Sequence, residues 1–135
     1  MELLCKINFP VLPIAKARPR HSRFGTVYTP KRTLDFEKDI GRMASAVYKG
    51  FPTRDPLKVE LYFRFPIAKT TKKKRFPGDF HIYRPDQDNL IKSVLDPLNK
   101  LIWVDDSQIC DLISYKRYSD DVGILLKAWK LCPGD

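Results

Sequence analysis

The sequence of 135 residues contains few side chains of the kinds that hold zinc or close disulfide scaffolds: three cysteines and two histidines. Cys5, Cys110 and Cys132 are odd in number and far apart, and no Cys/His group has the spacing of a zinc site. We therefore expect reduced thiols and no zinc-dependent chemistry. His21 and His81 are too isolated to be assigned as general bases, and the role of His81 stays open.

Long apolar runs are missing as well. No stretch approaches the roughly 18 consecutive apolar residues of a membrane span. Residues 1–6 lack the charged lead and apolar core of a secretion signal. The hydrophobic content of 43% and the aromatic content of 12% are nevertheless those of a folded protein. We expect one domain over residues 1–135, located in the cytoplasm, with no membrane partner and no small-molecule substrate.

Acidic residues are scarce in the first part of the chain. Residues 1–78 contain 18 lysines and arginines against 6 acids, whereas residues 79–135 contain 7 against 10, and the formal net charge is +9. A basic surface around an acidic site suits a polyanion such as nucleic acid, although many basic proteins are merely soluble.

Two loops, an N-terminal basic loop (residues 14–32) and a central basic loop (residues 66–78), carry most of this charge. The residues that we expect to contact phosphates are Lys16, Arg18, Arg20 and Arg23 in the first, and Lys69, Lys72, Lys73, Lys74 and Arg75 in the second. Phe24 and Tyr28 either contact exposed bases or anchor the N-terminal basic loop in the core.

Alternation of apolar and polar residues predicts the strands. Residues 3–9 and 57–65 alternate clearly, and residues 26–29 are long enough for a brief pairing. Residues 109–118 and 123–131 are separated by a short polar turn, which predicts an antiparallel hairpin.

Helical spacing of apolar residues predicts two helices. The first covers residues 33–48, with Thr33 as N-cap and Gly50 at the C-cap. The second begins at the N-cap Asp88 and is kinked or ends near Pro97, because proline removes a backbone hydrogen bond. The expected fold is a mixed α/β domain with a roughly four-stranded mixed sheet, two main helices and long basic loops.

Five carboxylates gather at the start of the second helix and beyond it: Asp86, Asp88, Asp96, Asp105 and Asp106. Asp86 and Asp88 at a loop-to-helix junction suit Mg²⁺, which takes one or two carboxylates and otherwise binds water and phosphate oxygens. Asp105 and Asp106 could close on the same cation, with Lys92 as a point charge beside it. In the alternative interpretation Asp88 only caps the helix, Lys92 makes a surface pair and the two later acids form a solvated turn.

Three ordered motifs carry a family resemblance: Pro85-Asp-x-Asp-Asn-Leu-x-Lys92, Leu95-Asp-x-Leu-Asn99 and Asp105-Asp-Ser-Gln-Ile109. Together they resemble the RusA family of Holliday-junction resolvases from bacteria and their prophages. The likeness extends loosely to Lys16-Ala-Arg-Pro-Arg20 and Tyr28-Thr-Pro30. Pro97 and Lys100 depart from the alanine and glycine usual in the family, and both lie past the acidic motif.

The resemblance implies a RusA-like fold and a homodimeric, Mg²⁺-dependent endonuclease that resolves four-way DNA junctions by paired symmetrical nicks during recombination and repair. Asp86, Asp88, Asp106 and Lys92 would be catalytic, Asp105 a further metal ligand, and Mn²⁺ an alternative cation. Asp96 matches a family acid of unclear role. Two rival functions stay open: a flap or single-strand nuclease with the same acidic site, and a non-catalytic basic DNA-architecture protein.

Overall fold

We describe a computed structural model in which residues 1–69 and 74–135 are placed; Lys72 and Lys73 lie outside the described residues. The described elements follow the order β1 (Glu2–Phe9), β2 (Arg20–His21), β3 (Val27–Tyr28), α1 (Lys31–Val47), β4 (Leu57–Phe65), α2 (Gln87–Leu98), the 3₁₀ turn η1 (Asp106–Gln108), β5 (Ile109–Tyr118) and β6 (Gly123–Lys130). Four strands form one mixed sheet in the order β1-β6-β4-β5. The predicted mixed α/β fold is confirmed.

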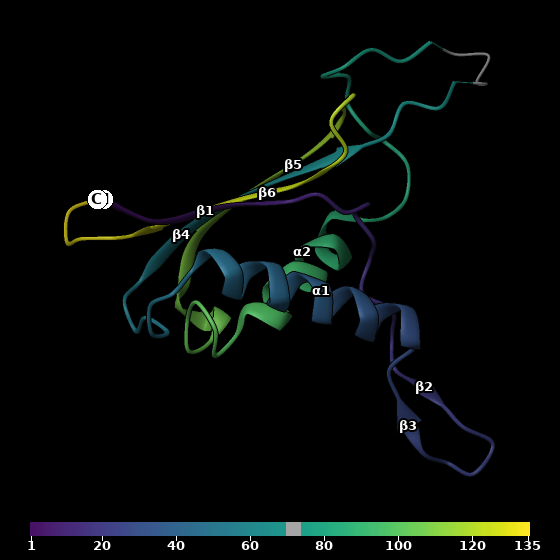
Figure 1. The fold of residues 1–135 in the computed structure, drawn as a ribbon, viewed down its shortest axis with the longest axis horizontal. Helices are drawn as coiled ribbons and strands as arrows, with labels where there is room; N and C mark the ends of the chain where they lie inside the picture. Colours follow the sequence, from purple (N-terminus) through teal and green to yellow (C-terminus); the bar gives the residue numbers. More distant parts are fainter. Residues whose placement is uncertain (70–73) are drawn as a thin grey trace.

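The two helices lie together on one face of this sheet, and no helix of the described residues covers the other face (Figure 1). Strand β4 explains the arrangement, because every second residue from Leu57 to Phe65 is buried and the residues between them are half-buried. The buried side chains meet those of α1 and α2, including Ile40, Leu90 and Leu98, in one hydrophobic core. No described helix is both long enough and apolar enough to cross a membrane.

The prediction of a hairpin between residues 109–118 and 123–131 is wrong. Strand β5 pairs in parallel with β4, and β6 pairs antiparallel with both β4 and β1. Strand β4 therefore lies between β5 and β6, and the connection passes over its end, where Ser119 N donates to Phe65 O at 2.9 Å. Four linking residues are enough, because two strands on either side of a third are only about 10 Å apart.

The N-cap and C-cap predicted for the first helix are wrong. Pro30 is the N-cap of α1, and Thr33 lies buried within the first turn. The Thr33 hydroxyl oxygen accepts a hydrogen bond from Ala17 N at 3.3 Å, so this side chain ties the N-terminal basic loop to α1 rather than capping the helix. At the other end the C-cap is Tyr48, in an extended conformation, and not Gly50.

The second helix begins two residues earlier than expected. Asp86, not Asp88, is the N-cap of α2, and Leu90 N donates to Asp86 O at 3.1 Å. The helix ends at Leu98, directly after Pro97, as the proline predicts. Pro97 is tolerated there because it lies in the last turn, where the lost backbone bond is followed by the helix end.

A two-stranded ribbon, β2 with β3, projects from the body of the molecule within the N-terminal basic loop (Figure 1). This pairing confirms the brief strand expected near residues 26–29. Phe24 at the tip is 86% exposed and Tyr28 is 46% exposed. Phe24 is therefore not a core anchor, and its ring is contacted by the Arg23 guanidinium group at 5.7 Å.

Candidate active site

Asp86 and Asp88 stand together at the N-terminus of α2. Both are exposed, and the Asp86 side chain makes no capping hydrogen bond. The partial positive charge of a helix N-terminus favours anions, and no side-chain hydrogen bond of Asp86 or Asp88 occurs among the described residues. This arrangement leaves oxygen ligands available to a cation.

Strand β5 fixes the loop that leads into Asp86. Lys116 Nζ donates to Tyr83 O and to Pro85 O, each at 2.6 Å. Burial lowers the pKa of Lys116, while the nearby charge of Asp86 acts in the opposite direction. Next along the chain, the Gln87 and Ser114 side chains are hydrogen-bonded to each other. No sequence pattern points to Lys116, because its role depends on the parallel pairing that places β5 beside this loop.

Asp96 and Lys16 join three segments of the chain. Lys16 Nζ lies 2.7 Å from Asp96 and 3.3 Å from Glu37, and Lys16 N donates to Asn89 O at 3.1 Å. Burial acts to lower the pKa of Lys16, but the hydrogen bond and charges of the two carboxylates outweigh it, and the pKa is raised. Asp96 thus holds the N-terminal basic loop against α2. The contribution of Lys16 to DNA binding stays a prediction, and its charge already has two partners.

Asp105 and Asp106 form a separate, well-bonded turn. Ser107 N donates to the Asp105 carboxylate at 3.1 Å, and Asp105 N donates to Gln108 Oε1 at 2.9 Å. The hydrogen bonds from Ser107 lower the pKa of Asp105. Gln108 also donates to the carbonyl oxygens of Thr53 and Asp55, so it fixes the turn to the start of β4. The Asp-Asp-Ser-Gln motif therefore has a structural function, and the Asp106 carboxylate has no hydrogen bond among the described residues.

The two pairs of acids adjoin different parts of strand β5. The N-terminus of α2 contacts β5 at Ser114 and Lys116, whereas Asp106 precedes the first residue of β5, Ile109. Five residues of strand span about 17 Å, which is far beyond the reach of one cation. In agreement, the described residues contain no group of three or more His, Cys, Asp or Glu side chains that could hold a metal ion. The assignment of Asp86, Asp88, Asp105 and Asp106 to one metal site stays a prediction.

Lys92 is exposed on α2, one helical turn after Asp88 and one before Asp96. Asp96 is engaged by Lys16, and no ion pair of Lys92 occurs among the described residues. Its ammonium group is therefore available on the same edge of the helix as Asp88. A catalytic role for Lys92 stays a prediction.

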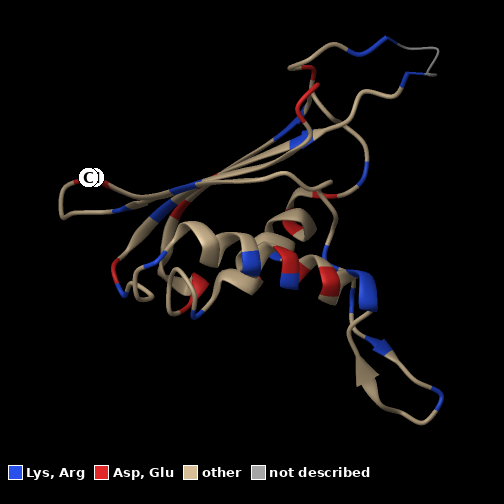
Figure 2. Cartoon of the chain, in the orientation of Figure 1, with Lys and Arg blue, Asp and Glu red and all other residues tan. Residues whose placement is uncertain are grey.

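The basic residues lie on two projections at the same end of the molecule as the start of α2. Figure 2 shows Lys and Arg in the β2–β3 ribbon and in the described part of the central basic loop, at the right of the view. Arg75 lies over the rings of Tyr83 and Tyr118, each 5.6 Å away, and donates to the Tyr83 hydroxyl at 3.0 Å. This packing directs part of the central basic loop toward the residues that precede Asp86.

His81, whose role the sequence left open, packs in an aromatic cluster and lines the same hollow as Asp86. Its ring stacks on Phe65 at 4.0 Å, and its buried Nδ1 has no hydrogen-bond partner among the described residues. Burial lowers the pKa of His81 below its usual value near 6.5, and the charges of Lys116 and Arg75 lower it further. The imidazole is therefore neutral at pH 7, and it packs rather than acting as a charged contact.

This depressed pKa gives a pH prediction. As the pH falls, the unfolded chain takes up the proton before the folded protein does, so the free energy of unfolding decreases between the usual pKa and the lower folded-state pKa. His81→Phe keeps a ring in the cluster but cannot titrate. We expect its melting temperature to depend less on pH between pH 7 and 5 than that of the wild type. If the melting temperatures of the two proteins fell equally with pH, His81 would not be the source of the pH dependence.

Free carboxylates between two basic projections are the arrangement of a protein that acts on a phosphate backbone. Comparison with known proteins gives the class: residues 10–127 match the family described as "Endodeoxyribonuclease RusA". The chain therefore belongs to the RusA family of endodeoxyribonucleases, the Holliday-junction resolvase family that the motifs resemble. It is also 34% identical over 119 residues to the "Uncharacterized protein YqaN" of Bacillus subtilis (strain 168), with 81% of this chain and 84% of the relative covered.

Proposed function

We propose that this protein is a homodimeric, Mg²⁺-dependent endonuclease that resolves four-way DNA junctions by paired symmetrical nicks in recombination and repair. The observation that carries the proposal is the pair of exposed carboxylates, Asp86 and Asp88, at a helix start whose preceding loop is fixed by Lys116. Family membership supports the substrate class.

The residues at the start of α2 fit a hard cation. Mg²⁺ typically takes one or two protein carboxylates and keeps its remaining positions for water and substrate oxygens. Asp86 and Asp88 can supply those two carboxylates, and Mn²⁺ would suit the same donors. When bound, the cation would activate water and stabilise charge on the leaving oxygen. Lys92, from the same edge of α2, would neutralise charge that develops on the phosphate.

A second copy of the chain would supply the remaining acids. Strand β5 is at the edge of the sheet, and Leu112 and Ile113 on it are 42% and 39% exposed. Its outer edge is covered at residues 116–118 by residues 78–81, where His81 N donates to Lys116 O at 3.2 Å. Gln87 contacts Ser114 O, so residues 109–113 are the uncovered part, and their exposed Leu112 and Ile113 suit pairing with another strand.

The alternation of the strand supports one way in which two such edges would pair. Backbone groups of Lys116 and Tyr118 point outward, so those of Leu112 and Ser114 do as well, whereas the register of β5 against β4 shifts at Cys110. Antiparallel pairing about a two-fold axis at Leu112 would set residues 109–111 of one copy opposite residues 113–115 of the other. Such a register would bring Asp106 of the second copy toward the start of α2, where Asp86 and Asp88 lie.

The two basic projections would hold the DNA arms. In the described part of the chain the proposed contacts are Arg18, Arg20, Arg23, Lys69, Lys74 and Arg75, and Lys72 and Lys73 are proposed from the sequence alone. Contacts of this kind give affinity that falls steeply with salt and carry little sequence information.

The test is a substrate comparison with the purified protein. Synthetic four-way, flap, single-stranded and linear DNA are incubated with Mg²⁺, with Mn²⁺ and with chelator, and the cut positions are mapped. We expect cleavage only with a metal, and paired nicks at symmetrical positions of the four-way junction. Preferred cutting of flaps or single strands would replace the proposal with the rival nuclease. Binding without cleavage in any metal would make the protein a non-catalytic DNA-binding protein.

A further inference from the structure

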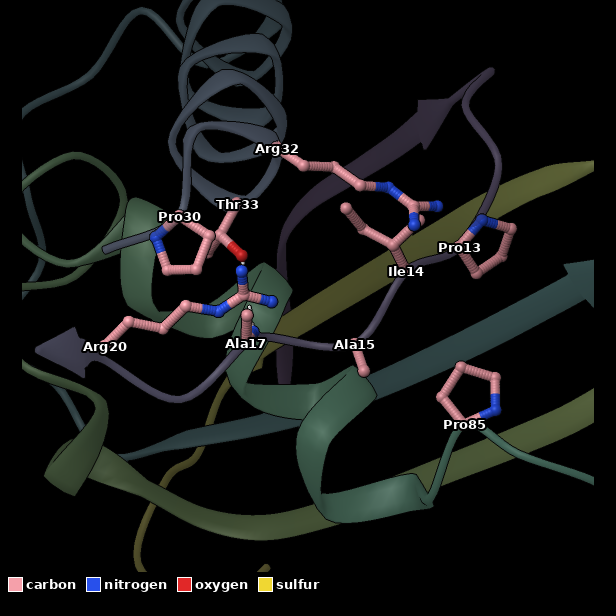
Figure 3. A pocket seen from close by; sticks show the side chains of 9 residues that line it. All are labelled: Pro13, Ile14, Ala15, Ala17, Arg20, Pro30, Arg32, Thr33 and Pro85. Atoms are coloured by element: carbon pink, nitrogen blue, oxygen red, sulfur yellow. Dashed lines mark hydrogen bonds between the residues drawn. The ribbon is translucent and has the colours of Figure 1, made fainter. Parts of the chain in front are cut away.

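A pocket of about 320 Å³ lies beside the candidate active site, between the N-terminal basic loop and the first turn of α1. Part of its wall is apolar and includes Pro13, Pro30 and Pro85, and two arginines, Arg20 and Arg32, border it (Figure 3). No acidic residue lines it. The sequence pointed to Arg20 only as one of several basic residues, and Arg32 was not singled out.

Both guanidinium groups are uncommitted. Neither Arg20 nor Arg32 has an ion pair or side-chain hydrogen bond among the residues that the structure describes, and both side chains are exposed. The nearby carboxylates of Glu37 and Asp96 are already engaged by Lys16. The first turn of α1 also contains no acidic residue. The pocket is therefore electropositive without an internal counter-ion.

The pocket opens toward the candidate metal ligands. Ala15 and Pro85 line it and also line a neighbouring hollow of about 470 Å³ that contains Asp86 and Asn89. The wall between the two hollows is held in place, because Thr33 accepts a hydrogen bond from Ala17 N and Asn89 O accepts one from Lys16 N. A ligand in the pocket would lie directly beside a phosphate bound at Asp86.

We propose that this pocket binds one nucleotide of the branch point, turned out of the base stack, next to the phosphate that is cut. The proposal rests on the proposed function and deepens it. Proline and alanine walls offer flat apolar contact to a base, and guanidinium groups bind phosphate oxygens or stack on a base plane. A free phosphate would leave the apolar walls unused, and an apolar ligand would leave both arginines without a partner. Nucleotides at a branch point are the least costly to unstack.

Fluorescence of 2-aminopurine tests the proposal without cleavage. The base analogue is placed in turn at each nucleotide beside the branch point of a synthetic four-way junction, and the protein is added with Ca²⁺ in place of Mg²⁺. We expect the fluorescence to increase strongly at one position when the wild-type protein is added, because a base turned out of the stack is no longer quenched by its neighbours.

Three variants separate the pocket from general DNA binding. Ala17→Leu fills the pocket and spares the hollow that contains Asp86, whereas Arg20→Ala and Arg32→Ala remove its charges. Each is expected to abolish the fluorescence increase and to slow junction cleavage in Mg²⁺ by about tenfold or more. Each arginine variant should also reduce the slope of log affinity against log salt by about 1. The matched controls are Ala46→Leu and Arg42→Ala, which change exposed residues of α1 that do not line the pocket.

The outcomes distinguish the two proposals. Cleavage by the wild type without a fluorescence increase at any position would overturn the pocket assignment, and so would an increase that survives in the arginine variants and in Ala17→Leu. Because the arginines are exposed, their replacement tests the pocket even if Ala17→Leu fails to fold. A wild type that cuts no branched DNA would overturn the proposed function, while a fluorescence increase lost only in the pocket variants would still support the nucleotide site.

Discussion

Asp88→Asn is expected to reduce junction cleavage in Mg²⁺ by more than about 100-fold, since even outer-shell partners of metal ligands are commonly worth 10- to 100-fold. Asparagine keeps the size of the side chain but removes the charge that would bind the cation. Affinity for the junction should stay the same or increase, because a carboxylate that repels the phosphate backbone is lost. Single-turnover cleavage and gel-shift titration of one junction measure both effects.

The control for this substitution is Asp120→Asn, which removes an exposed carboxylate from the turn between β5 and β6. This substitution changes the net charge by the same amount, at a position far along the chain from the start of α2. The Asp120→Asn protein should cleave the junction at the wild-type rate. An Asp88→Asn protein that cuts at the normal rate would exclude Asp88 from the metal site. A loss of binding together with cutting would mean that the helix start had been disturbed.

The second large expected effect is the recovery of cleavage when two inactive variants are mixed. If Asp86 and Asp88 of one chain act with Asp106 of the other, Asp88→Asn and Asp106→Asn homodimers are each inactive. A mixed dimer would contain one site with both changes and one intact site. Random exchange makes about half of the dimers mixed, so the mixture should nick junctions while neither variant alone does. The products should be single nicks rather than paired ones.

Two further measurements make this result decisive. Mixed dimers are verified by affinity-tagging one variant, and mixed dimers that do not nick would show that each site belongs to one chain. Leu112→Lys places a charge in the middle of the free edge of β5, which is how natural sheets prevent edge pairing. This variant should sediment as a folded monomer and lose cleavage, whereas a dimer that still cuts would exclude the β5 pairing.

The sequence was most informative where one short segment decides its own structure. Strand β4 alternates so regularly that its buried face follows directly from the residue order, and Pro97 marked the end of α2 correctly. The caps were misplaced because Thr33 and Asp88 have the right chemistry but lie inside the first turns. Thr33 is instead occupied by Ala17 N, a partner 16 residues away that no local pattern reveals.

The candidate site shows the same limit. Its acidic motifs were recognisable from residue types and spacing, and family membership agrees with them. The position of Asp106 relative to Asp86 could not be recognised from residue types and spacing, because it follows from the parallel alignment of β5 on β4. The contribution of Lys116 and the pocket between Arg20 and Arg32 depend equally on segments that meet only in the folded chain.

The position of β4 between β5 and β6 also has a consequence for how the molecule is made. The last two strands of the chain, β5 and β6, do not pair with each other, so the C-terminal end cannot nucleate a hairpin during synthesis. Each pairs instead with β4, which is contributed by the middle of the chain. Such non-local pairing raises contact order and slows folding. Until β5 has paired with β4, the loop before Asp86 lacks its contact with Lys116, so we expect the candidate active site to be assembled late.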